Sequence, residues 1–411
     1  MLVLYKNKPP SMTTVHLFAQ IASLIDRDIV KKAAKEFLTD KYSKNLDTWS
    51  HLVVMLFCQL AGCNSLRDVN HGMAGICKQL NHLGIRKAPS RNALSHQNRN
   101  RCAEVFRRIY IRLSKKLLGQ HKFECRFKHN IKASRIKMLD SSTITLCLKF
   151  FNWAHYSEEK GAIKLHTLFS LRDFLPVDIH ISDGKEADND GAYHVMPGPR
   201  SIVVADRGYD DSQLWNAWDS MGTTFVVRLR KDIHFKRLGE FSLPDDRAQQ
   251  ILVDEAIELT GDETSVQYPR PLRRVVVYNP YDTSRKKQPS ETAPQGPAEH
   301  VVELVTNNAK WDAETVSELY LARWRIETFF KVIKQNLRIK TFLGTNENAV
   351  HTQIWTAMIA ILLLQYLRTR SRYNWHMSNL VTFLRIHLMS HINLWLWLDQ
   401  IEISGIPPPK L

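Results

Sequence analysis

The chain has 411 residues, which is long enough for two or three domains with a sizeable core. It contains 57 Lys and Arg against 41 Asp and Glu, so its formal net charge is +16. A surplus of this size favours a polyanionic partner, because phosphate contacts made by Lys and Arg release counterions. Charge alone does not distinguish DNA from RNA or from an anionic membrane surface.

The cysteines and the apolar runs limit the compartment. Six cysteines occur without CxxC spacing, which argues against a disulfide or zinc framework and favours thiols in a reducing compartment. The first residues contain no apolar signal core, and the longest apolar run, 354–367, is too short to cross a bilayer. We therefore expect a cytoplasmic protein without a membrane partner.

Residues 1–130 are expected to form a helical N-terminal region. Residues 65–118 read as paired helices joined by a turn, and Ser90 is placed to cap the last, strongly basic helix. This pattern allows a helix-turn-helix that reads DNA. It equally allows a helical bundle with a solvated basic face.

A mixed α/β unit is expected at 131–230. Three β-branched segments are followed by the apolar strand "IVVA", a helix and a further strand. Residues 231–305 read as a separate β-rich module that includes a polar, Pro-rich loop at 284–300. Residues 306–411 return to helix, with Asp312 as the expected N-cap.

The stretch "YLARWRIETFFKVIKQ" at 320–335 carries a file of polar residues. On one helix these residues fall within a sector of about 80°. They are Tyr320, Arg323, Glu327, Lys331 and Lys334. A separate apolar stripe can face a core, and it is made by Ala322, Ile326, Phe329, Phe330, Ile333 and Leu337. The simpler interpretation is a surface helix with a Glu327–Lys331 ion pair.

Two carboxylates are expected at the ends of strands. Asp140 ends "IKMLD" and Asp206 ends "IVVAD", and sites in α/β sheets gather at such positions. Together with Glu327 they make three acids that a sheet and a helix could bring together. Crowded carboxylates need cations, and two Mg²⁺ ions held by oxygen ligands can drive an in-line phosphoryl displacement.

Other motifs are missing or incomplete. The sequence has no GxxxxGK[ST] loop, no HExxH and no GxGxxG after a strand. The segment "EADNDG" at 186–191 mimics the start of a calcium loop, but Pro197 stands where the bidentate Glu belongs. The 17 histidines form no pair with the spacing of a zinc motif.

Taken together, these residues resemble the DDE transposases of the bacterial insertion-sequence group called the IS4 family. Tyr320, Arg323, Glu327 and Lys334 match the spacing of that family's signature, which is Tyr, two residues, Arg, three residues, Glu, six residues and Lys. "DRGY" at 206–209 and "MLDSSTI" at 138–144 resemble the settings of the two aspartates. The resemblance covers roughly 130–400 and is weaker before that.

The resemblance implies an α/β fold with an RNase H-like core at 131–230 and 306–411, the β-rich insertion 231–305, and an all-α DNA-binding region at 1–130. It implies that the three acids, Asp140, Asp206 and Glu327, are catalytic and hold two Mg²⁺ ions, with Mn²⁺ as a substitute. The residues expected to bind DNA are Tyr320, Arg323, Lys331, Lys334 and Arg207.

The implied reaction is nicking at terminal inverted repeats, hairpin formation and strand transfer. The implied partners are transposon-end and target DNA and a second copy of the chain in the synaptic complex, in a nucleoid-associated bacterial protein. In relatives an aromatic residue of the insertion stacks on a flipped base; the candidates here are Phe235, Phe241, Tyr268, Tyr278 and Tyr281. An inactive or repurposed DNA-binding descendant and an RNase H-like nuclease remain alternatives.

Overall fold

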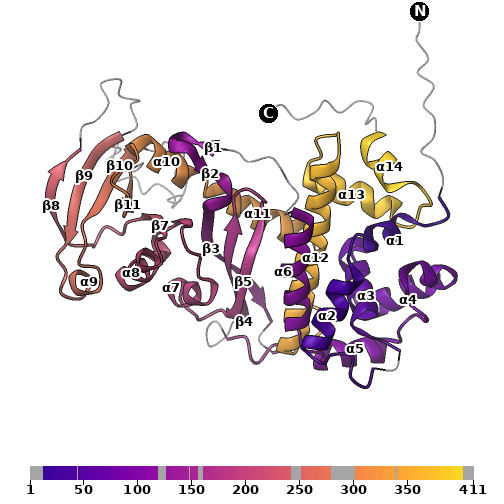
Figure 1. Ribbon diagram of the computed structural model, residues 1–411. Helices are drawn as coiled ribbons and strands as arrows, with labels where there is room; N and C mark the ends of the chain where they lie inside the picture. Colours follow the sequence, from indigo (N-terminus) through magenta and orange to yellow (C-terminus); the bar gives the residue numbers. More distant parts are fainter. Residues whose placement is uncertain are drawn as a thin grey trace, which may run out of the picture. The chain divides into compact units, whose positions relative to one another are not determined.

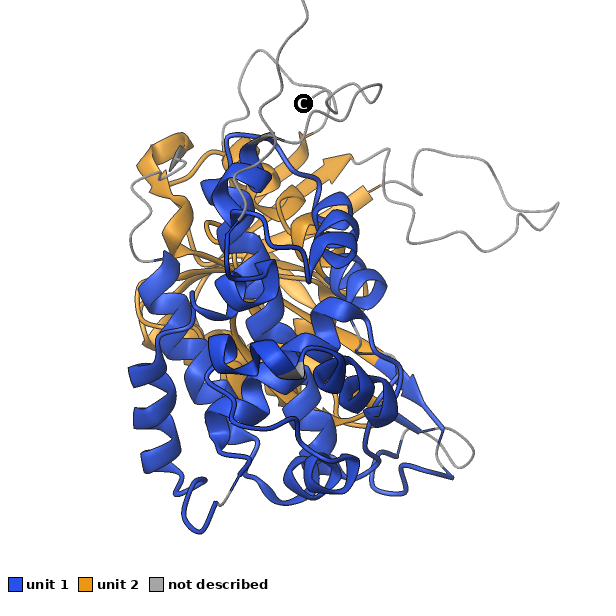
Figure 2. Ribbon diagram, turned by 90° about the vertical axis from the view of Figure 1, so that its right-hand side faces the viewer, with its two compact units in different colours: residues 1–121, 144–162, 330–411 blue, residues 122–143, 163–329 orange. Residues whose placement is uncertain are grey.

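The computed structural model describes residues 13–400, apart from 44, 119–125, 148, 156–160, 242–250, 279–300, 338 and 340 (Figure 1). The Pro-rich loop and Tyr281 lie outside these residues. The backbone divides into two compact units (Figure 2). Unit 1 comprises 1–121, 144–162 and 330–411, and unit 2 comprises 122–143 and 163–329. The four segments expected from the sequence follow different boundaries, and as functional domains they stay predictions.

A nine-stranded sheet runs in the order β5-β4-β3-β6-β7-β11-β10-β9-β8. The expected mixed α/β class is therefore confirmed, since helices flank a large sheet. The strands are β3 (Ile136–Leu146), β4 (Gly161–Ser170), β5 (Leu175–Asp183), β6 (Ile202–Ala205), β7 (Thr224–Arg228), β8 (Phe235–Glu240), β9 (Ile251–Leu259), β10 (Leu272–Tyr278) and β11 (Val301–Thr306). A separate two-stranded sheet pairs β1 (Arg126–Phe127) with β2 (Ile131–Lys132).

The centre of the sheet is parallel and its flanks are antiparallel. β3, β6 and β7 run parallel, whereas β4 pairs with β5 antiparallel. All four residues of β6 are buried, as the apolar "IVVA" predicts for a strand covered on both faces. The segment 231–305 supplies strands that continue this same sheet, because β11 pairs antiparallel with β7 and β10, β9 and β8 follow outward.

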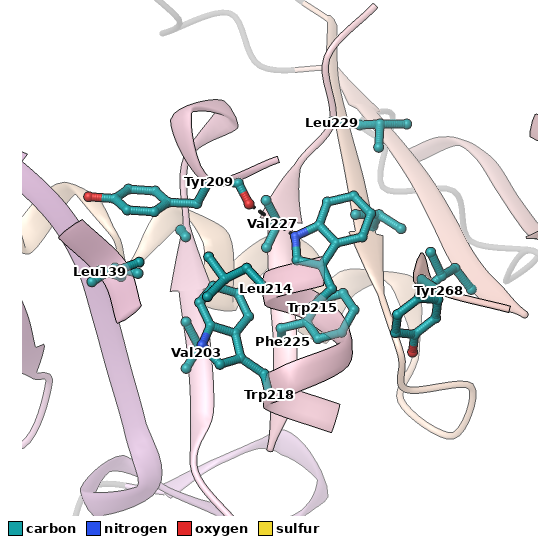
Figure 3. Packing of buried hydrophobic residues seen from close by; sticks show 14 of the residues in the cluster. Leu139, Val203, Tyr209, Leu214, Trp215, Trp218, Phe225, Val227, Leu229 and Tyr268 are labelled. Carbon is teal, nitrogen blue, oxygen red and sulfur yellow. Dashed lines mark hydrogen bonds between the residues drawn. The ribbon is translucent and has the colours of Figure 1, made fainter. Parts of the chain in front are cut away.

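A tryptophan-rich helix packs on the centre of the sheet. Helix α8 (Ser212–Ser220) is capped at its N-terminus by Asp211, whose Oδ1 accepts a hydrogen bond from the Leu214 N–H at 2.9 Å. Its buried face includes Trp215 and Trp218, and the Trp215 ring stacks on Phe225 of β7 with centroids 5.6 Å apart (Figure 3). Trp215 also donates from Nε1 to the Tyr209 carbonyl at 3.0 Å, so this core fixes the segment just after β6.

The remaining elements of unit 2 are short helices and helical turns. They are η2 (Lys128–Asn130), η3 (Ala133–Arg135), α7 (Asp188–Ala192), η4 (Tyr193–Val195), η5 (Arg207–Tyr209), α9 (Asp262–Gln267) and α10 (Ala313–Leu321). Helix α11 (Trp324–Asn336) crosses the boundary between the units. Asp312 caps α10 as expected, since its Oδ1 accepts from the Thr315 N–H at 2.7 Å.

Unit 1 is a helical assembly around one long helix. Its helices are α1 (Leu17–Ala22), α2 (Arg27–Glu36), α3 (Thr48–Ala61), α4 (Leu66–Gly75), η1 (Cys77–Leu83), α5 (Arg91–Asn100), α6 (Glu104–Leu118), α12 (Glu347–Arg370), α13 (Met377–His387) and α14 (Leu394–Gln400). α12 packs on α3, α5, α6 and α13. By length and composition α12 could cross a membrane, but 89% of its apolar window is buried in the protein. The strongly bent pair α3 and α4 passes the same test of length and composition.

The expected basic helix after Ser90 is two helices. Ser90 does cap α5, because its Oγ accepts from the Ala93 N–H at 3.2 Å. The helix then ends at Arg101, which has an extended backbone and a buried side chain. The Arg101 guanidinium donates to the Leu46 carbonyl at 2.6 Å, so burial of this one cation separates α5 from α6.

Candidate active site

Strand register places the two aspartates side by side. Leu139 of β3 pairs with Ala205 of β6, so the next residues, Asp140 and Asp206, occupy equivalent positions on adjacent parallel strands. Adjacent strands lie about 4.8 Å apart. Ala205 in turn pairs with Val227 of β7, which puts Arg228 beside Asp206 at the same edge. The site is therefore built at one level of three parallel strands.

The expectation that Asp140 ends its strand was wrong. β3 continues to Leu146, six residues further. What ends near Asp140 is the parallel pairing with β6, whose last partners are Leu139 and Ala205. Asp206 does follow the end of its strand, and its Oδ1 accepts from the Gly208 N–H at 2.8 Å to start η5.

The single helix expected over 320–335 is broken. α10 ends at Leu321 and α11 begins at Trp324, and Arg323 lies in the turn between them. Tyr320 is 8% exposed, and its hydroxyl is hydrogen-bonded to Arg228. The predicted apolar stripe is buried at Ile326, Phe329, Phe330, Ile333 and Leu337, while Ala322 is half-buried.

Arg323 joins two of the three acids. Its Nη1 lies 3.5 Å from Asp140 Oδ2 and its Nη2 lies 2.7 Å from Glu327 Oε1. Glu327 thus pairs with Arg323, four residues before it on the chain. Burial lowers the pKa of Arg323, but Tyr320 and the acids outweigh burial and raise it. The guanidinium is held here as the counter-ion of the acids.

The acids carry the electrostatic signature of a cation site. Burial raises the pKa of Asp140 to about 7, and the charges of Asp206 and Glu327 act in the same direction against Arg323. Within the described residues, the one group of His, Cys, Asp or Glu whose ligand atoms all lie within 4.8 Å of one another is elsewhere in the fold. The oxygens of Asp140, Asp206 and Glu327 are therefore more widely spaced than that. Three carboxylates, two of them bridged by one guanidinium, nevertheless form an oxygen donor set that suits a hard divalent ion.

The sequence interpretation missed three residues beside these acids. A Cβ atom at Gly208 would lie 3.0 Å from Asp188 Oδ2 and 3.1 Å from Asp206 Oδ1, so Asp188 faces the same small space. Lys164 Nζ lies 2.9 Å from Asp188 Oδ1. Tyr209 is buried beside these acids, and burial together with the charges of Asp140 and Asp188 raises its pKa. The only sequence signal was the position of Asp188 within the rejected calcium-like segment.

The residues expected to bind DNA differ in exposure. Arg207 in η5 and Lys331 in α11 are exposed, and Lys334 is half-buried. Lys331 and Lys334 follow Glu327 by four and seven positions in one helix, so they share its face. Tyr320 is too buried to reach DNA without a rearrangement. These roles stay predictions.

The candidates for base stacking also separate. Tyr268 is 1% exposed and its hydroxyl donates to Asp219 at 2.8 Å, so it belongs to the core. Phe235 and Phe241 lie against the guanidinium groups of Arg274 and Arg273. Tyr278 is half-buried in β10.

Comparison with known proteins identifies the region that contains the site. The family described as "Transposase DDE domain" matches residues 132–363, more than half of the chain. "Domain of unknown function (DUF4372)" matches residues 13–86. The first match includes all three acids, Tyr320, Arg323 and both lysines of α11.

Three curated relatives carry transposase names. The chain is 26% identical over 251 residues to "Probable transposase for insertion sequence element IS5377" of Geobacillus stearothermophilus. The matched region covers 61% of this chain and 61% of the relative. It is 27% identical to "Putative transposase y4zB" of Sinorhizobium fredii, over 68% of this chain and 71% of the relative. It is 22% identical to "Putative transposase for insertion sequence element IS4SA" of Synechocystis sp., over 91% and 98%.

The chain thus spans less than two thirds of the first of these relatives. Among solved structures, the piggyBac transposase synaptic complex with hairpin DNA is similar at 12% identity and a TM-score of 0.42, over 93% of this chain and 83% of that one. A likeness at this level establishes neither fold nor function.

Proposed function

Because this chain belongs to the transposase DDE domain family, we propose that it is a DNA transposase of an insertion sequence, in which Asp140, Asp206 and Glu327 are the catalytic acids. The observation that carries the proposal is the register of β3 and β6, which sets Asp140 beside Asp206, together with the Arg323 bridge from Asp140 to Glu327. The transposase names of the relatives agree with an insertion-sequence origin, and the IS4 group is compatible with them.

We propose further that the core is RNase H-like. In support, the strand order β5-β4-β3-β6-β7 combines a paired antiparallel edge with three central parallel strands. The inserted strands β8 to β10 and the returning β11 then lie between the second acid and the third along the chain. The helical region that precedes the core is proposed to bind DNA.

Divalent ions, with Mg²⁺ proposed and Mn²⁺ as a substitute, would supply Lewis-acid charge at the scissile phosphate. Asp140, Asp206 and Glu327 would hold them through carboxylate oxygens. Glu327 is more accessible than Asp140, with 38% of its side chain exposed against 15%, so it can adjust its position. Burial, together with the charges of Asp206 and Glu327, raises the pKa of Asp140, and cations held here would favour its charged form.

Arg323 is proposed to have two successive partners. In the structure it neutralises Asp140 and Glu327. With cations held by these acids, the guanidinium would be available to bind a phosphate of the transposon end, where its planar donors fit bidentate recognition. Arg207, Lys331 and Lys334 are proposed to contact further phosphates, and Tyr320 to hold Arg228 in place.

The proposed reaction proceeds in steps on one phosphodiester at a time. Water attacks the phosphorus at the repeat tip, the P–O3′ bond breaks and a 3′-OH is freed. That hydroxyl attacks a phosphorus of the opposite strand and expels the 3′-OH of the flanking DNA, which closes a hairpin. A second water attacks the hairpin phosphodiester and frees the 3′-OH again. This 3′-OH then attacks a phosphorus of target DNA and expels a target 3′-OH. Synapsis of two ends requires two copies of the chain, and a cytoplasmic, nucleoid-associated location follows from the substrate.

The first experiment uses DNA taken from the two flanks of the gene. Purified protein is incubated with these ends, with and without Mg²⁺, and the products are separated on a denaturing gel. Mg²⁺-dependent nicks at the repeat tips, followed by hairpin-length products, would support the proposal. Binding without cleavage, in Mg²⁺ or Mn²⁺, would instead favour an inactive or repurposed DNA-binding descendant.

The variant Glu327→Gln tests the role of the third acid. We expect it to abolish nicking while DNA affinity is largely retained, because it removes a metal-binding charge and keeps the side-chain shape. Glu318→Gln on the exposed side of α10 is the matched control and should cleave normally. Loss of DNA binding and of folding in Glu327→Gln would show a structural role for Glu327.

A further inference from the structure

A second group of metal-ligating side chains lies outside the carboxylate site. His180 is in β5, Glu186 follows that strand in the turn, and His194 is in η4. Their ligand atoms all lie within 4.8 Å of one another, and among the described residues they are the one such group of His, Cys, Asp or Glu. Three successive pieces of backbone therefore direct ligands to one point.

The separations match those around a small tetrahedral ion. His180 Nε2 lies 3.0 Å from Glu186 Oε2, and His194 Nε2 lies 3.8 Å from Glu186 Oε1. Around an ion with bonds of about 2.0–2.1 Å, neighbouring ligand atoms are about 3.3 Å apart. The observed separations lie on either side of this value. His194 has room to rotate the remaining distance, because 57% of its side chain is exposed.

The two imidazoles are already arranged for a shared ligand. Their rings stack with centroids 4.1 Å apart and 22° between the planes. Both Nε2 atoms face the same Glu186 carboxylate. His180 is held in place by its hydrogen bond to Glu186, which favours binding, whereas His194 would turn to complete the site.

A buried histidine supports Glu186 from below. His166 of β4 pairs with His180 across the strands, and its Nε2 lies 3.2 Å from Glu186 Oε2. Its Nδ1 is buried without a hydrogen-bond partner, so the ring proton belongs on Nε2, which is hydrogen-bonded to the Ser182 hydroxyl at 3.1 Å. A Cβ atom at Gly191 would lie 2.1 Å from His166 Nδ1, so the ring cannot move in that direction. Outer groups of this kind orient metal ligands.

We propose that His180, Glu186 and His194 bind one transition-metal ion of the zinc class. Two imidazoles and one carboxylate suit a borderline ion such as Zn²⁺ and leave a fourth position for water, whereas Mg²⁺ prefers oxygen ligands. The ion would tie the end of β5 to η4 and so close the segment between them into a loop. This site is separate from the catalytic acids in position and in ligand chemistry.

The closed loop carries a residue of the candidate active site. Lys164 Nζ donates to the Glu186 carbonyl at 2.9 Å and lies 2.9 Å from Asp188 Oδ1. Asp188 in turn faces Asp206 across Gly208. An ion at His180, Glu186 and His194 would therefore hold the segment that positions Asp188, and its loss would loosen that segment first.

The test measures metal binding directly, without DNA. Untagged full-length protein is stripped with EDTA, supplied with excess Mg²⁺ to occupy the carboxylate site, and titrated with Co²⁺, whose visible absorption reports tetrahedral nitrogen and oxygen ligands. We expect one Co²⁺ per chain, displaced by Zn²⁺. His194→Ala and His180→Ala should each weaken binding about tenfold or more. His234→Ala, at an exposed histidine in the same unit, should bind like the parent protein.

Three results would overturn the proposal. They are the absence of Co²⁺ and Zn²⁺ binding by the folded parent protein, unchanged affinity in both histidine variants, and loss of binding in Asp206→Asn with retention in the histidine variants. His194→Ala is the decisive variant, because its exposed side chain can be removed without disturbing the core. Since no cleavage is measured, these outcomes are independent of whether the protein is an active transposase.

Discussion

Replacing Asp140 by Asn is expected to make the metal-free protein more stable above neutral pH. Burial raises the pKa of the Asp140 carboxyl to about 7 from 3.8, and Asp206 and Glu327 add to the effect while Arg323 opposes it. The folded state thus binds the proton more tightly than the unfolded state. Stability falls as pH rises from about 4 to 7, because folding then requires a charged carboxylate in a crowded, buried place.

The magnitude follows from the shift. A difference of about 3 pKa units at 1.36 kcal/mol each gives about 4 kcal/mol as an upper limit above pH 7. At roughly 2 °C per kcal/mol for a long chain, Asp140→Asn should raise Tm by several degrees at pH 8 in EDTA. The gain should shrink as pH falls toward 4, because the parent carboxyl is then protonated in both states.

The assay is thermal unfolding in EDTA from pH 4 to 8. Asp232→Asn, at an exposed aspartate, serves as control and should shift Tm little at any pH. Added Mg²⁺ should then stabilise the parent protein and leave Asp140→Asn nearly unchanged, since an ion that binds only the folded state stabilises it. A Tm difference that does not vary with pH, or equal stabilisation of both proteins by Mg²⁺, would refute the assignment of Asp140 to a cation site.

Further predictions concern groups around the sheet. Arg323→Ala should weaken DNA binding and make the salt dependence shallower by about one unit of slope, and an unchanged slope would exclude a phosphate contact. Gly208→Ala should reduce nicking with DNA affinity retained, because the added Cβ meets Asp188 and Asp206 at 3.0 and 3.1 Å; normal nicking would show that these acids can move apart. Asp254→Ala removes the carboxylate paired with the buried Arg273, which would keep only backbone carbonyl partners, and should cost about 3–5 kcal/mol in urea unfolding; a cost below 1 kcal/mol would contradict this view of the pair.

Local sequence pattern predicted the elements that build the site. The apolar run before Asp206 was sufficient to predict a buried strand, and the helix expected after it is α8. The N-caps at Ser90 and Asp312 were also correct, because capping depends on residues three positions apart.

What failed depended on contacts distant in the chain. The basic helix after Ser90 breaks because Arg101 turns inward to the Leu46 carbonyl, and helix periodicity contains no information about that partner. The break before Trp324 follows the same logic, since Arg323 is drawn to Asp140 on a strand far earlier in the chain.

The histidine cluster was missed for a related reason. His180 and His194 do not show the short spacing of a zinc motif, and the path of the chain from β5 through the turn into η4 brings them to Glu186. Residue spacing alone does not predict this path. Strand register explains the error at Asp140. The residue pattern does not indicate that β3 continues beyond its parallel pairing with β6.

The extension of the sheet beyond β7 bears on self-association. Phe225, Val226 and Val227 are fully buried, and β11 pairs with this strand. The outermost strand of that flank is instead β8, which is mostly exposed and carries Lys236 and Arg237. Charged side chains on an edge strand oppose pairing with a neighbouring molecule. A protein trimmed of β8 to β10 would present the apolar edge of β11 to the solvent, and we would expect it to aggregate.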